Sequence, residues 1–204
     1  MRAALIGLGS MGRNHYRTIK NNQDINFVAV VEPNDELIAD IDVRRYRDVE
    51  QLLENEQIDL AVIATPTSTH LDISRKFLER GVHLLIEKPI TTNSKQAVQL
   101  SNLAHKNNCK LVVGHVERFN PAIQAVFPHL AGHKIIHIEA TRLSSYPTRI
   151  TDVGVKLDLS IHDIDLVNLL TPSNIETCYG LDSSNIRNKD DDAVFIMKFY
   201  DGAL

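Results

Sequence analysis

Two patterns of apolar and polar residues alternate along the first half of the chain. Short, almost continuous apolar runs are separated by longer segments whose apolar residues recur at helical spacing. Runs that are apolar on both faces are typical of parallel strands buried between two layers of helices. The alternation therefore predicts an α/β fold built on a doubly wound parallel sheet. The predicted strands of this sheet are residues 2–6, 27–31, 43–46, 58–64, 82–86 and 109–113.

Helix-start signals stand between these runs. Asp48 and Asn93 each come directly before a segment with helical spacing, and both residue types are favoured at helix N-caps. The segment 65–68 ends one apolar run and opens another helix, which stops at Gly81. Helices of this length are the usual connections between neighbouring parallel strands.

The pattern changes near Gly114. Residues 134–145 alternate loosely, which predicts a strand of a different sheet. The apolar residues of 157–170 recur at helical spacing, so we expect one helix there. Two further strands are predicted at 176–181 and 193–200.

The end of the sequence predicts an open sheet. Asp201-Gly202 is a hairpin signal, so a returning strand would begin at Ala203, just before the last residue, Leu204. We therefore expect two domains. Residues 1–118 would form the domain with the doubly wound sheet, and residues 119–204 a partial, truncated α+β domain.

Composition and charge narrow the class of protein. The chain has 204 residues and 43% hydrophobic residues, enough to bury a core. Its formal charge of -4 gives no general attraction to nucleic acid or to anionic membranes. Cys109 and Cys178 form no CxxC pair, so neither a disulfide framework nor a zinc cluster is indicated. No apolar segment reaches spanning length, so we expect a cytoplasmic protein whose partner is a small molecule.

A glycine-rich motif follows the first predicted strand. Gly7, Gly9 and Gly12 form a GxGxxG string that opens a helix, and Glu32 ends the next strand about twenty residues later. In dinucleotide-binding folds the glycines allow a tight turn, close approach of the pyrophosphate and close helix packing. The pyrophosphate then lies at the helix N-terminus, where free N–H groups and the helix dipole favour an anion. The motif predicts NAD rather than NADP, because Glu32 would accept bonds from ribose hydroxyls and repel a 2′-phosphate.

Five blocks of sequence match one known family. The blocks are 6–12 with His15, 65–70, 87–89, 114–121 and 158–165. In these blocks, which cover nearly the whole chain, it resembles the Gfo/Idh/MocA oxidoreductase family. Members of that family pair a Rossmann domain with an open-sheet α+β domain and mostly oxidise or reduce sugars and cyclitols. They continue through further strands that often form the subunit interface, so the resemblance implies a homo-oligomer for a full-length form.

The resemblance also implies roles for particular residues. The expected catalytic residues are Lys88, Asp158 and His162. The expected cofactor-binding residues are Gly7, Gly9, Ser10, Met11, Gly12, Glu32, Thr65, Pro66, His70 and Glu87. The expected substrate-binding residues are Lys88, Arg118, Asn120, Arg149, Asp158 and His162.

The residues themselves support this chemistry. Oxidising a carbinol with a nicotinamide needs a base for the hydroxyl proton and a cation near the developing alkoxide. Lys88 and His162 can divide these two roles. Asp158 and Asp165 would share a helix face with His162 and would orient its ring.

Structural interpretations stay open for several of these residues. Lys88 would otherwise be a solvated surface lysine, and His162 a histidine bonded to Asp158. His70 would either orient the cofactor loop or serve only the fold. Arg118 and Asn120 would either hold substrate or pin the domain junction.

Other basic residues are candidate ligands. Arg142, Arg149 and Lys156 would meet the diphosphate of a nucleotide sugar, although a solvated basic loop is the default interpretation. His129, His133 and His137 recur every four residues but cross from a predicted helix to a predicted strand, so we assign no metal.

The sequence thus predicts an NAD-dependent sugar dehydrogenase. Block 114–121 and residues 142–155 look most like members that oxidise carbon 3 of UDP-N-acetylglucosamine for bacterial surface glycans. The alternatives are a dehydrogenase of a free cyclitol or hexose, and a non-catalytic NAD-binding regulator on the same scaffold. Neither nucleic acid nor a membrane is an expected partner.

Overall fold

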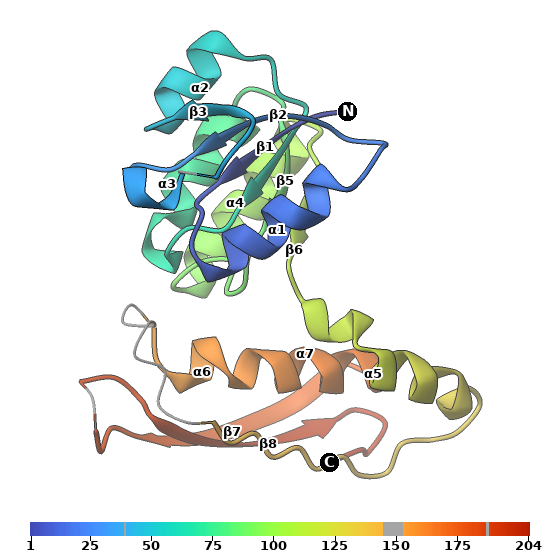
Figure 1. The fold of residues 1–204 in the computed structure, drawn as a ribbon. Coiled ribbons are helices and arrows are strands. Elements are labelled where there is room, and N and C mark those ends of the chain that lie inside the picture. The colour runs from blue at the N-terminus through green and yellow to red at the C-terminus, as the bar shows by residue number, and fades with distance from the viewer. Residues whose placement is uncertain (39, 145–152, 187) are drawn as a thin grey trace. The chain divides into compact units, whose positions relative to one another are not determined.

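The computed structural model describes residues 1–38, 40–144, 153–186 and 188–204 (Figure 1). The chain divides into two compact units, Met1–Gly114 and His115–Leu204.

The first unit is built on a six-stranded parallel sheet, which confirms the predicted α/β fold. Its strand order is β3-β2-β1-β4-β5-β6, so the direction of winding reverses where β1 lies beside β4. In the register, Leu5 of β1 faces Val30 of β2 on one side and Val62 of β4 on the other. The strands are β1 (Arg2–Ile6), β2 (Asn26–Val31), β3 (Arg44–Tyr46), β4 (Leu60–Ile63), β5 (His83–Ile86) and β6 (Leu111–Val113).

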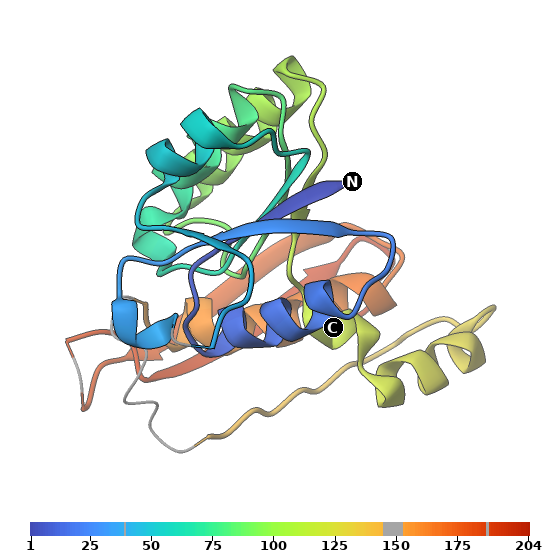
Figure 2. The ribbon, with the colours of Figure 1, turned by 45° about the horizontal axis from the view of Figure 1, so that its top comes forward.

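Helices cover both faces of this sheet. On one face, Tyr16 and Ile19 of α1 pack with Leu5, Val30 and Val62. On the other face, α2, α3 and α4 bury their apolar residues in a larger cluster. Figure 2 shows α1, in dark blue, and the α3 and α4 pair, in green, on opposite sides of the strands. The helices are α1 (Ser10–Lys20), α2 (Val49–Asn55), α3 (Thr67–Leu78) and α4 (Ser94–Lys106), with a short 3₁₀ turn η1 (Asp35–Leu37).

Two of these helices begin at the predicted N-caps. Asp48 accepts a hydrogen bond from the backbone N–H of Gln51 at 2.8 Å, and Asn93 accepts one from that of Gln96 at 3.1 Å. Each side chain satisfies a donor that the first helical turn leaves without a backbone partner. The N-cap of α3 is Pro66, which makes no side-chain cap bond.

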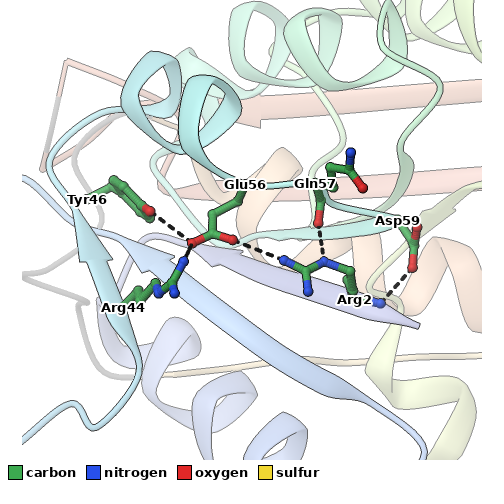
Figure 3. A network of polar contacts seen from close by, with 6 residues as sticks. All are labelled: Arg2, Arg44, Tyr46, Glu56, Gln57 and Asp59. Carbon is green, nitrogen blue, oxygen red and sulfur yellow. Dashed lines mark hydrogen bonds and ion pairs between the residues drawn. The ribbon is translucent and has the colours of Figure 1, made fainter.

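A buried carboxylate joins three side chains near the start of β1 and β3 (Figure 3). The side chain of Glu56 is 2% exposed and accepts hydrogen bonds from Arg2 and from Tyr46, each at 3.0 Å. Arg44 donates to the same carboxylate. These bonds, that of Arg44 foremost, hold the pKa of Glu56 below its usual range. We assign this network to stability, because it ties the first strand to α2 and to the edge strand.

The second unit combines helices with an antiparallel strand pair. β7 (Ile175–Ser183) and β8 (Asp192–Phe199) pair along their length, which confirms the two predicted strands. The turn after β8 is closed by a bond from Phe199 N–H to Ala203 O at 2.9 Å, and Gly202 has the positive φ of 90° that favours glycine. The remaining elements are η2 (Val116–Phe119), α5 (Pro121–Val126), η3 (Phe127–Leu130), α6 (Val155–Asp158) and α7 (Ser160–Leu170).

The strand predicted at 134–145 is wrong for the described residues 134–144, which form neither helix nor strand. Backbone bonds join this segment to Leu204, from Ile138 N–H to Leu204 O at 3.0 Å and from Leu204 N–H to Ile136 O at 3.1 Å. A strand needs a ladder of such bonds, whatever its side-chain pattern. Alternation alone therefore misled the prediction.

The single helix predicted at 157–170 is also wrong. It is two helices, α6 and α7, that meet at Leu159. The N–H of His162 bonds to Leu159 O at 3.1 Å, three residues back, so the first turn of α7 is tightened. Asp158 and His162 consequently lie on different helices, and of the three residues expected on one helix only His162 and Asp165 share one, α7.

Candidate active site

Most of the predicted cofactor residues lie in the loops at the carboxyl ends of the strands of the first sheet. Gly7–Gly12 follows β1, Glu32 follows β2, Thr65 and Pro66 follow β4, and Glu87–Pro89 follows β5. The winding reverses between β1 and β4. The carboxyl ends of these two strands therefore form the switch point at which open α/β sheets bind ligands. The fold thus gathers candidates that are far apart in the sequence.

Two glycines of the motif are required by close packing. Gly7 has a φ of 92°, and a Cβ there would lie 2.7 Å from Ala64 O. A Cβ on Gly12 would lie 2.1 Å from Gly7 O. Real Cβ atoms do not approach backbone oxygens so closely, so any larger residue would force the loop away from β4 or from α1.

The start of α1 has the features that a pyrophosphate needs. Its N-cap is Gly9, which makes no side-chain cap bond, so the first-turn N–H groups at Ser10 and Met11 are not capped by that residue. A Cβ on Gly9 would meet nothing within 4 Å, which leaves room for a ligand against the backbone. The residues present therefore fit the phosphates of a dinucleotide at the positive end of the helix.

Glu32 is bonded to the glycine loop. Its side chain lies in the interior, with the residue 8% exposed. Glu32 Oε2 accepts from the N–H of Leu8 at 2.8 Å, and Oε1 accepts from the N–H of Asn34 at 3.0 Å. Each carboxylate oxygen can accept a second hydrogen bond. The geometry therefore fits a ribose whose hydroxyls donate to Glu32.

A second buried carboxylate, Glu87, precedes Lys88. Glu87 Oε1 lies 2.7 Å from His15 Nε2, and Oε2 lies 3.3 Å from the backbone N of Lys88. A Cβ on Gly114 would lie 3.2 Å from Glu87 Oε1, so this position is also tightly enclosed. Lys88 is joined to Pro89 by a cis peptide bond. Sequence reasoning assigned no role to His15, although its place one turn after Gly12 on the same helix face was a usable signal.

His70 is buried on α3 between the loop that follows β4 and the loop that follows β5. It is 1% exposed, with Nδ1 lying 3.0 Å from Pro89 O and Nε2 2.9 Å from Thr65 O. Both ring nitrogens thus face backbone carbonyls of the protein. Among the described contacts, His70 joins the loop after β4 to the loop after β5.

The candidate catalytic residues of the second unit lie on consecutive helices. Asp158 ends α6 and is 8% exposed, and His162 lies in the first turn of α7. Asp165, one turn further along α7, is 9% exposed and binds Arg118 through both carboxylate oxygens, at 2.7 and 2.5 Å. His115 Nδ1 lies 3.7 Å from the same carboxylate.

The predicted substrate residues near the start of this unit, Arg118 and Asn120, bind other residues of the same unit. The bidentate bond to Asp165 raises the pKa of the Arg118 guanidinium. Asn120 Oδ1 accepts from the N–H of Ala122 at 3.0 Å, so it caps α5, and its Nδ2 donates to Glu117 at 3.0 Å. These contacts hold η2 and α5 in place.

Two of the basic residues expected near a diphosphate, Arg142 and Lys156, are each paired with a carboxylate. Arg142 forms a two-pronged pair with Asp163, with bonds from Nε to Oδ2 and from Nη2 to Oδ1 that are both 2.9 Å. Lys156 donates to Asp182 at 2.7 Å. Arg149 lies outside the described residues.

A cavity of about 780 Å³ lies within the second unit. Asp158, Val167 and Phe195 are among the residues that line it, together with the segment 137–144. It is therefore lined by residues of α6, α7, β8 and that segment, all of the second unit.

A family model matches the first unit of the chain. Residues 1–115 match the model of a family described as "Oxidoreductase family, NAD-binding Rossmann fold", the Gfo/Idh/MocA family. The chain belongs to this family. The predicted cofactor, NAD, agrees with the family's description, and the first unit is its NAD-binding Rossmann domain.

Relatives within the Gfo/Idh/MocA family match the second unit as well. UDP-N-acetylglucosamine 3-dehydrogenase from Acidithiobacillus ferrooxidans is 34% identical over an alignment that covers 100% of this chain and 65% of that protein. Inositol 2-dehydrogenase from Rhizobium meliloti is 28% identical, with 83% of this chain and 54% of that protein covered. The chain thus spans at most about two thirds of these relatives.

Solved structures of the Gfo/Idh/MocA family have the same fold. A structure of the Acidithiobacillus ferrooxidans enzyme superimposes with a TM-score of 0.87 at 33% identity, covering 100% of this chain and 67% of that one.

In the parts of the chain that the structure describes, no helix combines the length and the apolar character needed to span a bilayer.

Proposed function

We propose that this chain comprises the NAD-binding domain and part of the substrate domain of a dehydrogenase that oxidises carbon 3 of UDP-N-acetylglucosamine. The observation that carries the proposal is the similarity to UDP-N-acetylglucosamine 3-dehydrogenase, which extends over the whole chain, the second unit included. A shared Rossmann domain alone would support the cofactor and leave the substrate open. A role in diamino-sugar synthesis for lipopolysaccharide, and a cytoplasmic location, belong to the same proposal.

Three residues of this chain would carry the chemistry. His162 accepts the proton of the reacting hydroxyl, and Asp158 holds and orients the imidazole. Lys88, at the carboxyl end of β5, stabilises the alkoxide as it forms. Bound NAD would supply the hydride acceptor, so that the carbinol, losing a proton to His162 and a hydride to the cofactor, would become a ketone.

The cofactor residues would act through the contacts already described. The loop Gly7–Gly12 binds the pyrophosphate at the start of α1, and Glu32 accepts bonds from the adenosine ribose. Thr65 and Pro66 would contact the cofactor from the loop after β4, and Glu87 holds the backbone at Lys88.

Substrate contacts would come from the second unit. We propose that Arg118, oriented by Asp165, and Asn120 meet the sugar nucleotide together with Arg149.

A free cyclitol is the second candidate substrate. The similarity to inositol 2-dehydrogenase over 83% of this chain favours it, because that relative is named for an unphosphorylated ring alcohol. A non-catalytic regulator is the less favoured alternative, since Lys88 and His162 are both present.

The test is a substrate panel. The chain is incubated with NAD and either nucleotide sugars or free polyols, and the absorbance of reduced nicotinamide is followed. Lys88→Ala is the matched control for background reduction. Reduction with UDP-N-acetylglucosamine alone supports the proposal, whereas reduction with polyols alone favours the cyclitol alternative.

A further inference from the structure

The residues on both sides of Lys88 are each bonded to a histidine from a different helix. Glu87, on one side, is bonded to His15 of α1, and Pro89, on the other, to His70 of α3. We propose that His15 and His70 are positioning residues that fix the backbone at Lys88, and that His70 does so as an imidazolium. The importance of this for catalysis rests on the proposed role of Lys88.

The contact from α1 reaches Lys88 through one carboxylate. His15 Nε2 and Glu87 Oε1 are 2.7 Å apart, and their side chains are only 16% and 8% exposed. The other oxygen of Glu87 faces the N–H of Lys88 at 3.3 Å. Because Glu87 is only 6% exposed, its carboxylate has little room to turn away. A change at His15 would therefore be transmitted to the backbone of Lys88.

The contact from α3 requires two protons on one ring. Pro89 O and Thr65 O are both acceptors, and a neutral imidazole has only one N–H to donate. A neutral His70 would leave a ring lone pair facing a carbonyl oxygen in a site that is 1% exposed. An unmade bond in such a place is costly, whereas the imidazolium makes both.

Charged residues lie close to His70 and to its partner Pro89 in the sequence, and the place of His70 in its helix also bears on its protonation. Glu87 and Lys88 precede Pro89 on one loop, and Asp72 and Arg75 follow His70 on α3. His70 lies in the first turn of α3, where the helix dipole opposes a cation, as burial does. The two carbonyl acceptors oppose both effects.

The arrangement links the cofactor loops to Lys88. His15 lies on the helix that begins in the glycine loop, and His70 is bonded to Thr65 of the second cofactor loop. Movement of the glycine loop on cofactor binding would therefore reach Glu87 through His15, and movement of the second loop would reach Pro89 through His70.

Ring-nitrogen NMR of histidine-labelled protein tests the protonation of His70 without any need for activity. The His70 signals are assigned by their loss in His70→Gln, and the exposed His105 on α4 serves as the internal control. We expect both His70 nitrogens to carry protons in the folded protein at neutral pH. A single protonated nitrogen on His70 there would overturn the imidazolium.

A Lys88 reporter tests the positioning. With the lysines reductively methylated, the Lys88 signal is assigned with Lys88→Arg and followed in His15→Gln, His15→Leu and His70→Gln. Glutamine at position 15 can still donate to Glu87, so the Lys88 signal of His15→Gln should stay near that of the wild type. The Lys88 signals of His15→Leu and His70→Gln should shift. His105→Gln should leave it in place. An unmoved signal in both His15→Leu and His70→Gln would overturn the proposal.

Turnover then separates positioning from loss of fold. We expect His15→Leu and His70→Gln to lower turnover by about 10- to 100-fold with the Michaelis constant for NAD nearly unchanged, since small displacements at a catalytic group cost rates of this size. Restored turnover in His15→Gln supports positioning. If Lys88→Ala retains turnover, the proposed function fails, while the NMR results still decide the two contacts.

Discussion

The carboxylate of Glu32 accepts a hydrogen bond from the N–H of Leu8 at 2.8 Å, across 24 residues of sequence. The residue expected to recognise the ribose therefore also holds the glycine loop expected to bind the pyrophosphate. Both ends of the adenosine diphosphate site depend on one buried side chain.

We predict that the chain binds NAD more tightly than NADP. A 2′-phosphate placed about 4 Å from Glu32 would raise the free energy of binding by several kcal/mol at an intermediate dielectric. Glu32→Gln removes the charge and should narrow the preference. Calorimetric titration with each cofactor checks this, and equal affinities in the wild type would contradict it.

Gly9 and Gly12 should respond differently to alanine. Gly9 has φ and ψ of -62° and -169°, which alanine adopts without strain, and its Cβ would meet no protein atom within 4 Å. Gly9→Ala should thus keep the melting temperature and weaken NAD binding by about tenfold or more, since the methyl group occupies the space of the phosphates. Gly12→Ala should lower the melting temperature, because its Cβ would lie 2.1 Å from Gly7 O.

Thermal unfolding and NAD titration of the two variants provide the check. Unchanged NAD affinity in Gly9→Ala would show that the cofactor does not approach this backbone.

Glu56 should make the free energy of unfolding depend on pH in the acidic range. Because its pKa in the folded state is lowered, chiefly by the bond from Arg44, its contribution is complete above the ordinary value of 4.5 and is lost as the pH falls through the folded value. Arg44 is 71% exposed, so screening reduces the contribution, and we expect Glu56→Gln to lower the unfolding free energy by about 1–2 kcal/mol near neutral pH.

Denaturant titrations at several pH values test this prediction. The gap between wild type and Glu56→Gln should narrow as the pH falls below 4.5 and close as it passes through the lowered pKa of Glu56 in the folded state, where the carboxylate of the wild type becomes protonated. A constant gap would contradict the assignment.

The strand pair of the second unit should promote self-association. Tyr179 faces Ile196 and Leu181 faces Val194 across the strands, and all four side chains are 55–64% exposed. Contiguous exposed apolar surface of this kind favours association. The double variant Val194→Lys and Ile196→Lys should give a smaller particle by light scattering, and Val98→Lys, at an exposed valine of α4, is the control. A wild-type chain that stays monomeric at high concentration would contradict this.

The sequence predicted the first unit well because local signals determine it. Buried parallel strands are continuous apolar runs, and Asp48 and Asn93 carry the capping oxygen in their own side chains. The second unit was harder, because a strand at 134–145 depends on a partner ladder and the break at Leu159 leaves the apolar spacing unchanged.

The site was only partly predictable for a related reason. Lys88 and the glycines belong to motifs, whereas the acceptor of His70 is the carbonyl of Pro89 and that of His15 is a carboxylate 72 residues away. Backbone acceptors have no residue-type signature, and pairs this distant are joined only by the fold.

The most direct test of the account is the turnover of His162→Asn with NAD and UDP-N-acetylglucosamine, measured from the absorbance of reduced nicotinamide. If His162 removes the hydroxyl proton, turnover should fall by about 10² to 10⁴-fold. NAD affinity should be nearly unchanged, because the base acts on the substrate alone. Turnover within a factor of about two of the wild type would contradict the role of His162 and with it the proposed mechanism.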